Sequence, residues 1–379
     1  MSPPKFGSIG FLADPTATLS AMRAQGPLIE VKLPILGRVR FAVTDAAVRA
    51  LLKDTDTFVR NPKLATGKPM DRLYWWLPRS MRPLTLNMLV QDGETHARLR
   101  RHVDRAFARV TVDDLRPRIA AIADRRLDAL AADQDIDLKA GYTRQVPFEV
   151  ICHLLGIPEG DWPFFIKRLA PLSSANSIPS ALWSILRLGA VHRRLRSYFA
   201  RARGDGDLGG DRTLRAGLIG ALVQIADTES GSLSEDELLS MAFMLFVAGH
   251  ETTVHLIGDA IVALSERPDL RDRLRRAPDQ MPLFVEEVMR FYSPVMMTKL
   301  LFATRDTTFM GQPVRKGERF SAMLIGGSHD PDRFPTPETF VPDRRPNPQL
   351  GFGAGPHVCL GMQLARAEAQ ITLSRLLDR

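Results

Sequence analysis

Hydrophobic and polar residues follow two different periods along this chain, and the helical period dominates. Over residues 115–170 and 180–202, apolar side chains recur with the spacing that is typical of amphipathic helices. Residues 28–33 and 38–43 instead alternate every second position on either side of a Leu-Gly pair, which predicts a small β-hairpin. The pattern therefore predicts a mainly α-helical chain with little β-structure.

Shorter helices and further strands are predicted elsewhere. Helical periods also cover residues 14–25, 44–53, 94–110 and 281–292. We expect a mainly α (α+β) fold, with one large helical domain over residues 1–379. Small peripheral antiparallel β-sheets are expected, with strands at about 28–43 and 299–325.

The longest predicted helix begins at the capping box Ser234-Glu-Asp-Glu237 and extends to about Glu266, before Pro268. Roughly thirty helical residues span about 45 Å, which is the scale of the whole molecule. Residues 238–247 are apolar almost all round, as in a helix that is buried on every side. We therefore expect a long central helix.

A small polar motif, Ala248-Gly249-His250-Glu251-Thr252-Thr253, interrupts this apolar helix. Glycine and buried polar groups destabilise a buried helix, and such a cost usually marks a functional site. The structural alternative is a polar patch that faces another part of the protein, with the threonine hydroxyl satisfied.

Composition excludes several classes of protein. Hydrophobic residues make up 45% of the 379 positions and charged residues 25%, which is typical neither of disordered chains nor of membrane proteins. No signal peptide and no apolar run of about eighteen residues occur. Only Cys152 and Cys359 are present, so there is no disulfide framework. We expect a cytoplasmic protein without a membrane anchor.

The excess of basic residues gives an expectation about the binding partners of the protein. Lys and Arg number 51 against 43 Asp and Glu, which gives a formal net charge of +8. No nucleic-acid-binding pattern accompanies this charge, so we expect no nucleic acid to bind. The basic residues cluster in places that favour an acidic protein partner.

The segment Gly351-Phe-Gly-Ala-Gly-Pro-His-Val-Cys359-Leu-Gly361 carries the clearest chemical signal. Its glycines and proline predict a tight loop, and the residues after Cys359 predict a helix, whose N-terminus favours a thiolate. A lone thiolate does not suit zinc, which takes four ligands, but it suits one axial bond to a haem iron. Inert core packing is the alternative for a lone cysteine.

This loop resembles the haem-binding loop of the cytochrome P-450 family. Six residues fall where that pattern has them: Phe352, Gly353, Gly355, His357, Cys359 and Gly361. The resemblance implies that Cys359 is the axial ligand of a buried haem b, with the long central helix over it. It also implies cofactor-binding roles for Phe352, Gly353, His357 and Gly361.

The polar motif of the long helix resembles the family's oxygen-activating motif. In that motif the glycine, here Gly249, makes room beside the iron, and the alcohol, here Thr252, helps to deliver protons to dioxygen. The resemblance implies catalytic roles for Ala248, Gly249, Glu251 and Thr252.

The predicted helix over residues 94–110 has two faces. His96 and Arg100 share its apolar face, where a charged pair needs a buried anion. The family carries this pair for the haem propionates, whereas ordinary solvated charges are the alternative. The opposite face forms an arginine stripe that is expected to dock an acidic electron-transfer protein or merely to be solvated: Arg98, Arg101, Arg105 and Arg109.

Glu287 and Arg290 are spaced three residues apart within the predicted helix 281–292, which alone indicates only a solvated pair. In the family, matching residues form a Glu-Arg-Arg triad that holds the loop before the cysteine. Arg344 fits the third position of this structural triad.

The chain departs from the family pattern in two places. The strand after the Glu-x-x-Arg helix usually carries an arginine that reaches a haem propionate, but this position is Leu301 here. We expect Lys299, on the same strand face, to substitute for it. Relatives generally continue past the helix that ends near Arg379, so we expect either a truncated chain or a differently built pocket.

Residues 60–90 are rich in Pro, Trp and Met, which predicts either core lining or a lid over an apolar pocket. We expect an apolar small-molecule substrate, and terpenoid, fatty acid, aromatic and polyketide all fit. The expected pocket residues are Trp75, Trp76, Met244, Val247, Val295, Met296 and Met297.

The resemblance implies a haem-thiolate monooxygenase that inserts one atom of O2 into its substrate. It implies a monomer that receives electrons from NAD(P)H indirectly, through a ferredoxin or flavodoxin. Two alternatives stay open. One is a peroxygenase that uses H2O2, against which Glu251-Thr252 argues. The other is a non-catalytic haem protein for binding or sensing.

Overall fold

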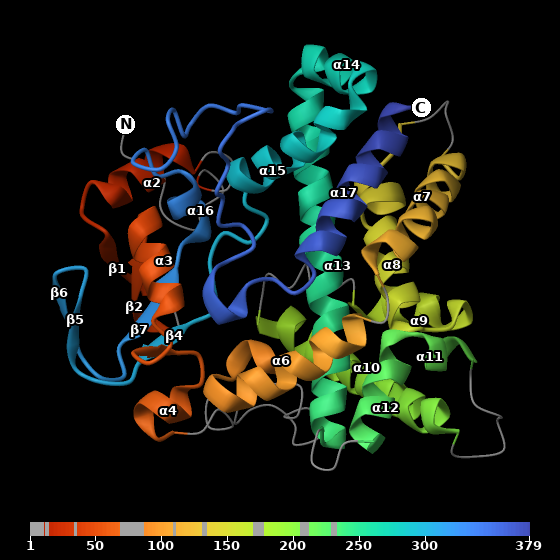
Figure 1. Cartoon of the computed structure of the whole chain (residues 1–379), viewed down its shortest axis with the longest axis horizontal. Helices are drawn as coiled ribbons and strands as arrows, with labels where there is room; N and C mark the ends of the chain where they lie inside the picture. The colour runs from red at the N-terminus through yellow and green to blue at the C-terminus, as the bar shows by residue number, and fades with distance from the viewer. Residues whose placement is uncertain are drawn as a thin grey trace. The chain divides into compact units, whose positions relative to one another are not determined.

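The computed structural model describes residues 11, 15–33, 36–68, 87–108, 111–130, 135–169, 178–204, 212–228 and 233–379. The chain divides into two compact units, Met1–Met70 with Asp259–Met362 and Asp71–Gly258 with Gln363–Arg379. Helices predominate and the sheets are small (Figure 1), so the predicted fold class is confirmed.

The first unit contains the β-structure. Its main sheet has five strands in the order β1-β2-β7-β4-β3, and β5 pairs with β6 in a separate hairpin (Figure 1). The strands are β1 Leu28–Leu33, β2 Gly37–Ala42, β3 Phe58–Val59, β4 Leu301–Ala303, β5 Thr307–Phe309, β6 Gln312–Val314 and β7 Arg319–Ala322. The β1–β2 hairpin was predicted, whereas β3 was missed because a strand of two residues shows no alternation.

One strand pair corrects the expectation of antiparallel sheets. β2 and β7 run parallel, with Phe41 opposite Ser321, whereas β3–β4 and β4–β7 are antiparallel. Parallel neighbours need a long connection, and most of the chain lies between β2 and β7. No local alternation can indicate such a pairing.

A helix packs on this sheet through an apolar cluster. α3 (Asp45–Lys53) begins at Thr44, whose side chain accepts a hydrogen bond from the Ala47 amide. Leu52 of α3 meets sheet residues in one buried cluster, together with Leu350 of a later loop. The sheet contributes Phe58, Leu301 and Phe320 to this cluster. Burying each such side chain contributes about 1.5–3 kcal/mol, so the cluster holds α3 and the loop against the sheet.

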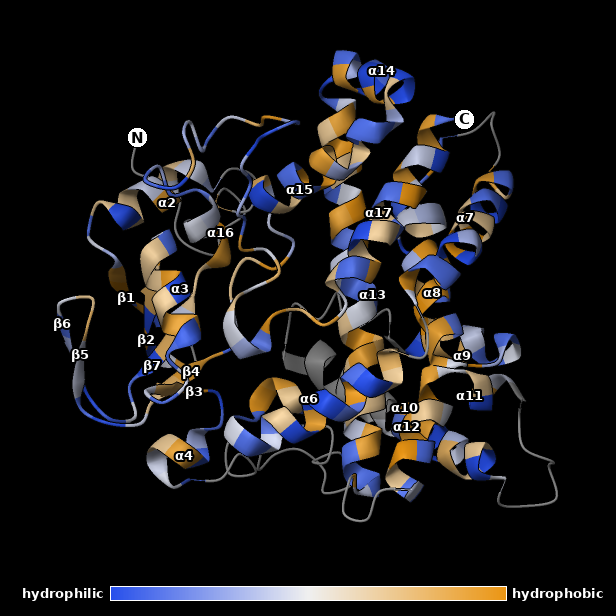
Figure 2. Cartoon of the chain, viewed as in Figure 1, coloured by the Kyte–Doolittle hydropathy of each residue, from blue (hydrophilic) through white to orange (hydrophobic). Residues whose placement is uncertain are grey.

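The other helices of the first unit are short. They are α2 Thr16–Arg23, α4 Pro62–Thr66, α14 Pro268–Arg276, α15 Met281–Phe291 and α16 Leu324–Ser328. Pro268, which the sequence marks as the end of the long helix, also opens α14, because the first turn of a helix tolerates a missing N–H. α14 is largely hydrophilic, as Figure 2 shows.

The described residues of the second unit contain helices and no strands. The helices are α6 Gly93–Phe107, α7 Val112–Asp128, the π-helix Lys139–Thr143, α8 Gln145–Leu155, α9 Trp162–Leu169, α10 Ile178–Arg203, α11 Arg212–Ala216, α12 Leu218–Thr228 and α17 Met362–Leu377. α8 is mostly hydrophobic (Figure 2), and almost all of its side chains are buried. It ends at Gly156, where φ is +79° and an added Cβ would lie 2.6 Å from the Thr213 carbonyl oxygen.

The long helix α13 extends over Glu235–Ser265, as predicted. The Ser234 amide donates to the Glu237 carboxylate at 2.9 Å, and the Glu237 amide donates to the Ser234 hydroxyl at 3.2 Å. This reciprocal pair satisfies two donors at the start of the helix. Within the described residues, no helix is both long enough and apolar enough to cross a membrane.

Candidate active site

The cysteine loop of the first unit adopts a tight, glycine-dependent conformation. Gly353 and Gly355 have φ of +74° and +71°, which side-chain-bearing residues rarely adopt. The Gly353 amide donates to the Leu350 carbonyl at 2.7 Å, and the Cys359 amide donates to the Phe352 carbonyl at 2.9 Å. These bonds fix the backbone at Cys359, a partly buried cysteine that precedes α17 by three residues.

A side chain would clash with the protein at one glycine of this loop but would meet open space at another. A Cβ added to Gly355 would lie 2.2 Å from the Leu52 carbonyl oxygen at the end of α3, so the loop could not keep its place with a larger residue. A Cβ added to Gly361 would meet no atom within 4 Å. The protein itself therefore demands glycine at 355 but leaves room at 361.

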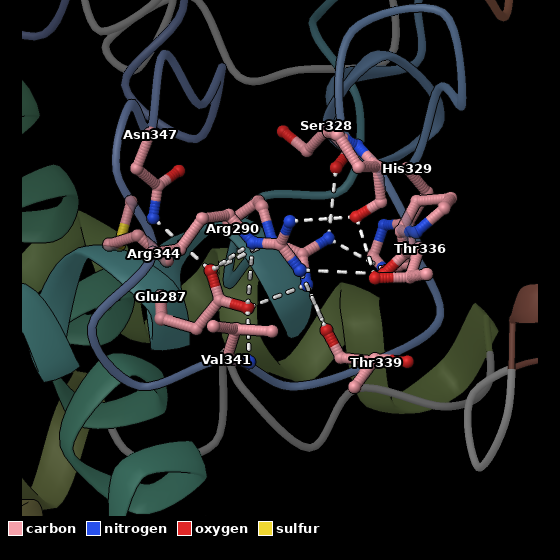
Figure 3. A network of polar contacts seen from close by, with 12 residues as sticks. Glu287, Arg290, Ser328, His329, Thr336, Thr339, Val341, Arg344 and Asn347 are labelled. Atoms are coloured by element: carbon pink, nitrogen blue, oxygen red, sulfur yellow. Dashed lines mark hydrogen bonds and ion pairs between the residues drawn. The ribbon is translucent and has the colours of Figure 1, made fainter.

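A buried carboxylate, Glu287 of α15, organises the segment that leads to this loop (Figure 3). Arg290 donates to both of its oxygens, at 2.8 and 2.9 Å, and Arg344 donates to it at 3.2 and 3.3 Å. The Val341 amide and the Asn347 side chain donate to it at 2.8 and 3.2 Å. The structure thus brings the three predicted triad residues together and adds Asn347, which no sequence pattern indicated.

Two guanidinium groups face this one carboxylate, so backbone carbonyls accept the remaining donors. Arg290 donates to Ser328 at 3.1 Å, to Pro337 at 2.8 Å and to Thr339 at 3.0 Å. Arg344 also donates to the Thr339 carbonyl, at 3.0 Å (Figure 3). The side chains of Glu287 and Arg290 are completely buried, which makes these bonds strong and their loss costly.

Further bonds connect this network to the cysteine loop. The Leu350 amide donates to the Ser328 hydroxyl at 3.1 Å, and the Gln349 side chain donates to Glu286 at 3.1 Å. The Gly351 amide in turn donates to the Gln349 side-chain oxygen at 2.5 Å. The start of the loop is therefore anchored on both α15 and α16.

Lys299 differs from its expected place. β4 begins at Leu301, so Lys299 precedes the strand instead of lying on its face. Its side chain reaches solvent, but the surrounding protein desolvates the ammonium and, together with the charge of Arg60, lowers the pKa of Lys299.

The second unit contains the polar motif of α13. Phe246 before the motif and Thr253 at its end are buried, whereas every residue from 247 to 252 is at least partly accessible. The Thr252 hydroxyl donates to the Ala248 carbonyl at 2.8 Å, which leaves its oxygen able to accept a hydrogen bond. The residues that were predicted to be catalytic are therefore partly accessible in a helix that is otherwise largely buried.

Gly249 lies beside helix α8, and His250 lies beside Arg144, the residue that precedes α8. A Cβ on Gly249 would lie 2.8 Å from Cδ1 of Ile151 in α8, so close helix packing also requires glycine here. Nε2 of His250 lies 3.2 Å from the Arg144 carbonyl oxygen. Burial lowers the pKa of His250, although this hydrogen bond and the Glu251 charge oppose the shift.

Helix α6 carries the predicted anion-binding pair. His96 is buried, and Arg100, partly buried, donates to Asp104 at 3.1 Å. The expectation that Arg98 belongs to an exposed stripe is wrong, because its half-buried guanidinium donates to Glu237 of α13 at 2.5 Å. Burial would raise the pKa of Glu237, but Arg98 and the cap at Ser234 hold it below its ordinary value.

The remaining predicted residues have diverse surroundings. Arg101 and Arg105 are exposed on α6. Met244 is buried, Val247 is partly accessible, and Val295 is 36% exposed. Met296 and Met297 pack on an apolar cluster near β1 and β2. Trp75, Trp76 and Arg109 lie outside the described residues.

Comparison with known proteins decides the family. The family model "Cytochrome P450" matches residues 211–379. A vitamin D(3) 25-hydroxylase of Pseudonocardia autotrophica is 32% identical, and the match covers 97% of this chain and 86% of the relative. The chain belongs to the cytochrome P450 family.

Two further similarities support this assignment. The mycinamicin IV hydroxylase/epoxidase of Micromonospora griseorubida is 36% identical over 88% of this chain and 79% of its own length. The structure of P450BioI in complex with an acyl carrier protein ligated to hexadec-9Z-enoic acid has a TM-score of 0.85 at 28% identity, covering 98% of this chain and 93% of that one.

Membership of the cytochrome P450 family has chemical consequences. The protein is an oxidoreductase of the monooxygenase type, with haem as the implied cofactor and with O2 and a redox partner implied for turnover. The residues present fit a haem. Within the first unit, backbone hydrogen bonds fix the glycine loop at Cys359, and the space around Gly361 is open.

Proposed function

We propose that this cytochrome P450 inserts one oxygen atom of O2 into a C–H bond or double bond of an apolar small molecule, while the other atom leaves as water. The observation that carries this proposal is the conformation of the cysteine loop. Positive-φ glycines fix the conformation of the loop that carries Cys359, and the buried Glu287 network anchors the segment before it, which supports the proposal that the Cys359 thiolate would hold the haem iron.

The proposed roles divide between binding and proton transfer. When bound, haem b would supply O2 binding and O–O bond cleavage, which a thiolate donor promotes. Cys359 would be the axial ligand. His357, His96 and Arg100 would bind the haem carboxylates, since each can present a donor to an anion.

Thr252 and Glu251 are proposed to manage protons. The Thr252 hydroxyl is oriented by its bond to the Ala248 carbonyl, so its oxygen can accept a hydrogen bond from a reacting group or a water. Glu251, the preceding residue on the accessible part of α13, would exchange protons with water. Electrons would come from NAD(P)H through a ferredoxin or flavodoxin.

Isotope labelling tests the reaction class. A substrate is first found by screening terpenoids, fatty acids, aromatic compounds and polyketides for shifts in the haem absorption spectrum. Turnover under 18O2 with a redox chain should then put one 18O atom into each product molecule. Product formed only with added H2O2 would favour the peroxygenase alternative, and binding without any turnover would favour a haem sensor.

We predict that Thr252→Ala keeps substrate binding but diverts electrons to hydrogen peroxide, because the oriented hydroxyl is lost. The amount of product formed per NAD(P)H consumed should fall about tenfold. This loss is smaller than the full rate enhancement that a positioned proton donor or acceptor can give. The measurement is product and peroxide per NAD(P)H.

Thr253→Ala is the matched control for this variant. The Thr253 hydroxyl makes the same kind of bond, to the Gly249 carbonyl at 3.3 Å, but its side chain is buried. Thr253→Ala should therefore keep the wild-type ratio. An unchanged ratio in Thr252→Ala would remove Thr252 from the mechanism.

We predict that reversing Arg101 and Arg105 to Glu slows reduction of the iron by the ferredoxin. Both side chains are exposed on α6, so reversal should act on association with an acidic partner. The rate should fall about tenfold at low salt, and the defect should shrink once the Debye length drops below about 10 Å. Stopped-flow reduction over a salt series measures this effect.

A second double variant tests whether the rate of reduction depends on charges at one place on the surface or only on the net charge of the protein. Arg275→Glu with Arg276→Glu changes the total charge equally, on the exposed part of α14. This variant should be reduced at the wild-type rate. If the Arg101 and Arg105 reversal is reduced equally fast at low salt, the docking site lies elsewhere.

A further inference from the structure

The proposed reaction consumes protons that must come from solvent. In a hydroxylation, O2, two electrons and two protons convert one C–H bond into an alcohol and release one water. Glu251 would take up these protons, but its side chain is only partly accessible. A group that exchanges protons with solvent and also reaches Glu251 would therefore serve the reaction.

Helix spacing gives Glu251 one neighbour that can exchange a proton. Side chains three or four residues apart lie next to each other on a helix, with Cβ atoms about 5–6 Å apart. Val247, Ala248 and Val254 occupy three of the four such positions around Glu251, and none of them carries an exchangeable proton. The fourth position is His255, one turn further along α13. Within this described helix, His255 is the only adjacent side chain that can pass a proton to Glu251.

His255 also connects this turn of α13 to solvent. Its side chain is exposed, and among the described residues no hydrogen bond or ion pair engages its ring. The other histidine beside Glu251 differs, because His250 is half-buried and its Nε2 lies 3.2 Å from the Arg144 carbonyl oxygen. That contact occupies one ring nitrogen of His250, whereas both ring nitrogens of His255 are available for a relay.

The surroundings of His255 keep its imidazole neutral near pH 7. The contact with His250 places Arg144 beside α13, and the π-helix that begins at Lys139 ends just before Arg144. Partial burial lowers the pKa of His255, although the Glu251 charge opposes this shift. The charges of Lys139 and Arg144 lower the pKa further. Because the ordinary pKa of histidine is about 6.5, the ring is neutral at pH 7, with one donor and one acceptor nitrogen.

We propose that His255 passes protons from solvent to the Glu251 carboxylate during turnover. This inference rests on the proposed monooxygenase function. In each transfer, one ring nitrogen takes a proton from a buffer acid in the solvent, while the other gives its proton to a Glu251 oxygen, directly or through one water. The imidazole ends as its other neutral tautomer, and Glu251 becomes protonated.

The test measures turnover in a variant without the imidazole. His255→Gln keeps a polar side chain of similar size but cannot relay protons near neutral pH. With saturating substrate and an excess of the redox partner, the rate of product formation should fall about tenfold. The loss is smaller than a full general acid contributes, because water can still reach Glu251. The dissociation constant of the substrate and the reduced carbon monoxide band should not change.

The pH dependence distinguishes a proton carrier from a structural residue. An imidazolium is a stronger proton donor than a neutral imidazole. The rate of the wild type relative to His255→Gln should therefore rise as the pH falls through the lowered pKa of His255, below about 6.5. A residue that only supports the fold would give the same ratio at every pH at which the carbon monoxide band shows intact protein.

Two further variants are the controls. His153→Gln removes another exposed histidine of the second unit, on α8, whose pKa burial also lowers. This variant should form product at the wild-type rate. Adding His255→Gln to Glu251→Gln should cause little further loss, because His255 acts through that carboxylate.

The outcomes are distinguishable. Equal rates of product formation by wild type and His255→Gln overturn the inference, and so does a ratio of these rates that stays constant with pH. A loss that His255→Gln adds in full to Glu251→Gln overturns it as well. None of these results touches the proposed function while the wild type puts one atom of 18O2 into its product. A wild type that forms no such product overturns the proposed function itself.

Discussion

Cys359→Ser should abolish the red-shifted Soret band of the reduced protein under carbon monoxide. Only a thiolate ligand gives this band, and a serine hydroxyl stays protonated and donates far less electron density to iron. The loss should be complete, because the described loop offers no second sulfur to the site. Difference spectra of reduced protein with and without carbon monoxide measure it.

Cys152→Ala is the matched control, since it removes the other cysteine. Burial in α8 raises the pKa of the Cys152 thiol, and the Glu149 charge raises it further, so this thiol stays protonated. The variant should keep the band and lose only about 1 kcal/mol of stability from the small cavity. A Cys359→Ser protein that retains the band would show that Cys359 is not the ligand.

Glu287→Gln should destabilise the protein by about 3–5 kcal/mol, because it leaves two buried guanidinium groups without their anion. The amide keeps the shape of the side chain, so the loss reports charge more than packing. Urea unfolding measures the free energy of unfolding, and the haem content of the purified protein reports the cysteine loop.

The neighbouring acid gives the comparison for this variant. Glu286→Gln changes the adjacent residue in the same helix, where the carboxylate is half-buried and accepts a bond from Gln349 at 3.1 Å. Its cost should stay near 1 kcal/mol. Equal stability of Glu287→Gln and wild type would mean that the carbonyl acceptors alone satisfy Arg290 and Arg344.

A double change distinguishes the network from its members. Replacing both Glu287 and Arg290 by Met removes opposite charges together, so it should cost less than the sum of the two single changes. Independent, additive losses would argue against a coupled network around Glu287.

Local sequence determined most elements of this fold. The capping box and the helical period placed α13 within a residue of its observed ends, and two-residue alternation placed β1 and β2. Glycines 353 and 355 and the helix after Cys359 likewise follow from conformational preferences of single residues. Such features depend on neighbours close in the chain, so a pattern of a few residues suffices to indicate them.

Partners that are distant in the sequence were decided only by tertiary structure. The helical period of α6 predicts a surface position for Arg98. The tertiary structure instead pairs it with Glu237 of α13, which is 139 positions away in the sequence. The pairing of β3 with β4 likewise sets Val59 opposite Phe302, although β3 is too short to show a period. Helical or strand period fixes which way a side chain points along its own element, but its partner depends on how elements pack. The packing free energy is spread over the whole core, and no short motif encodes it.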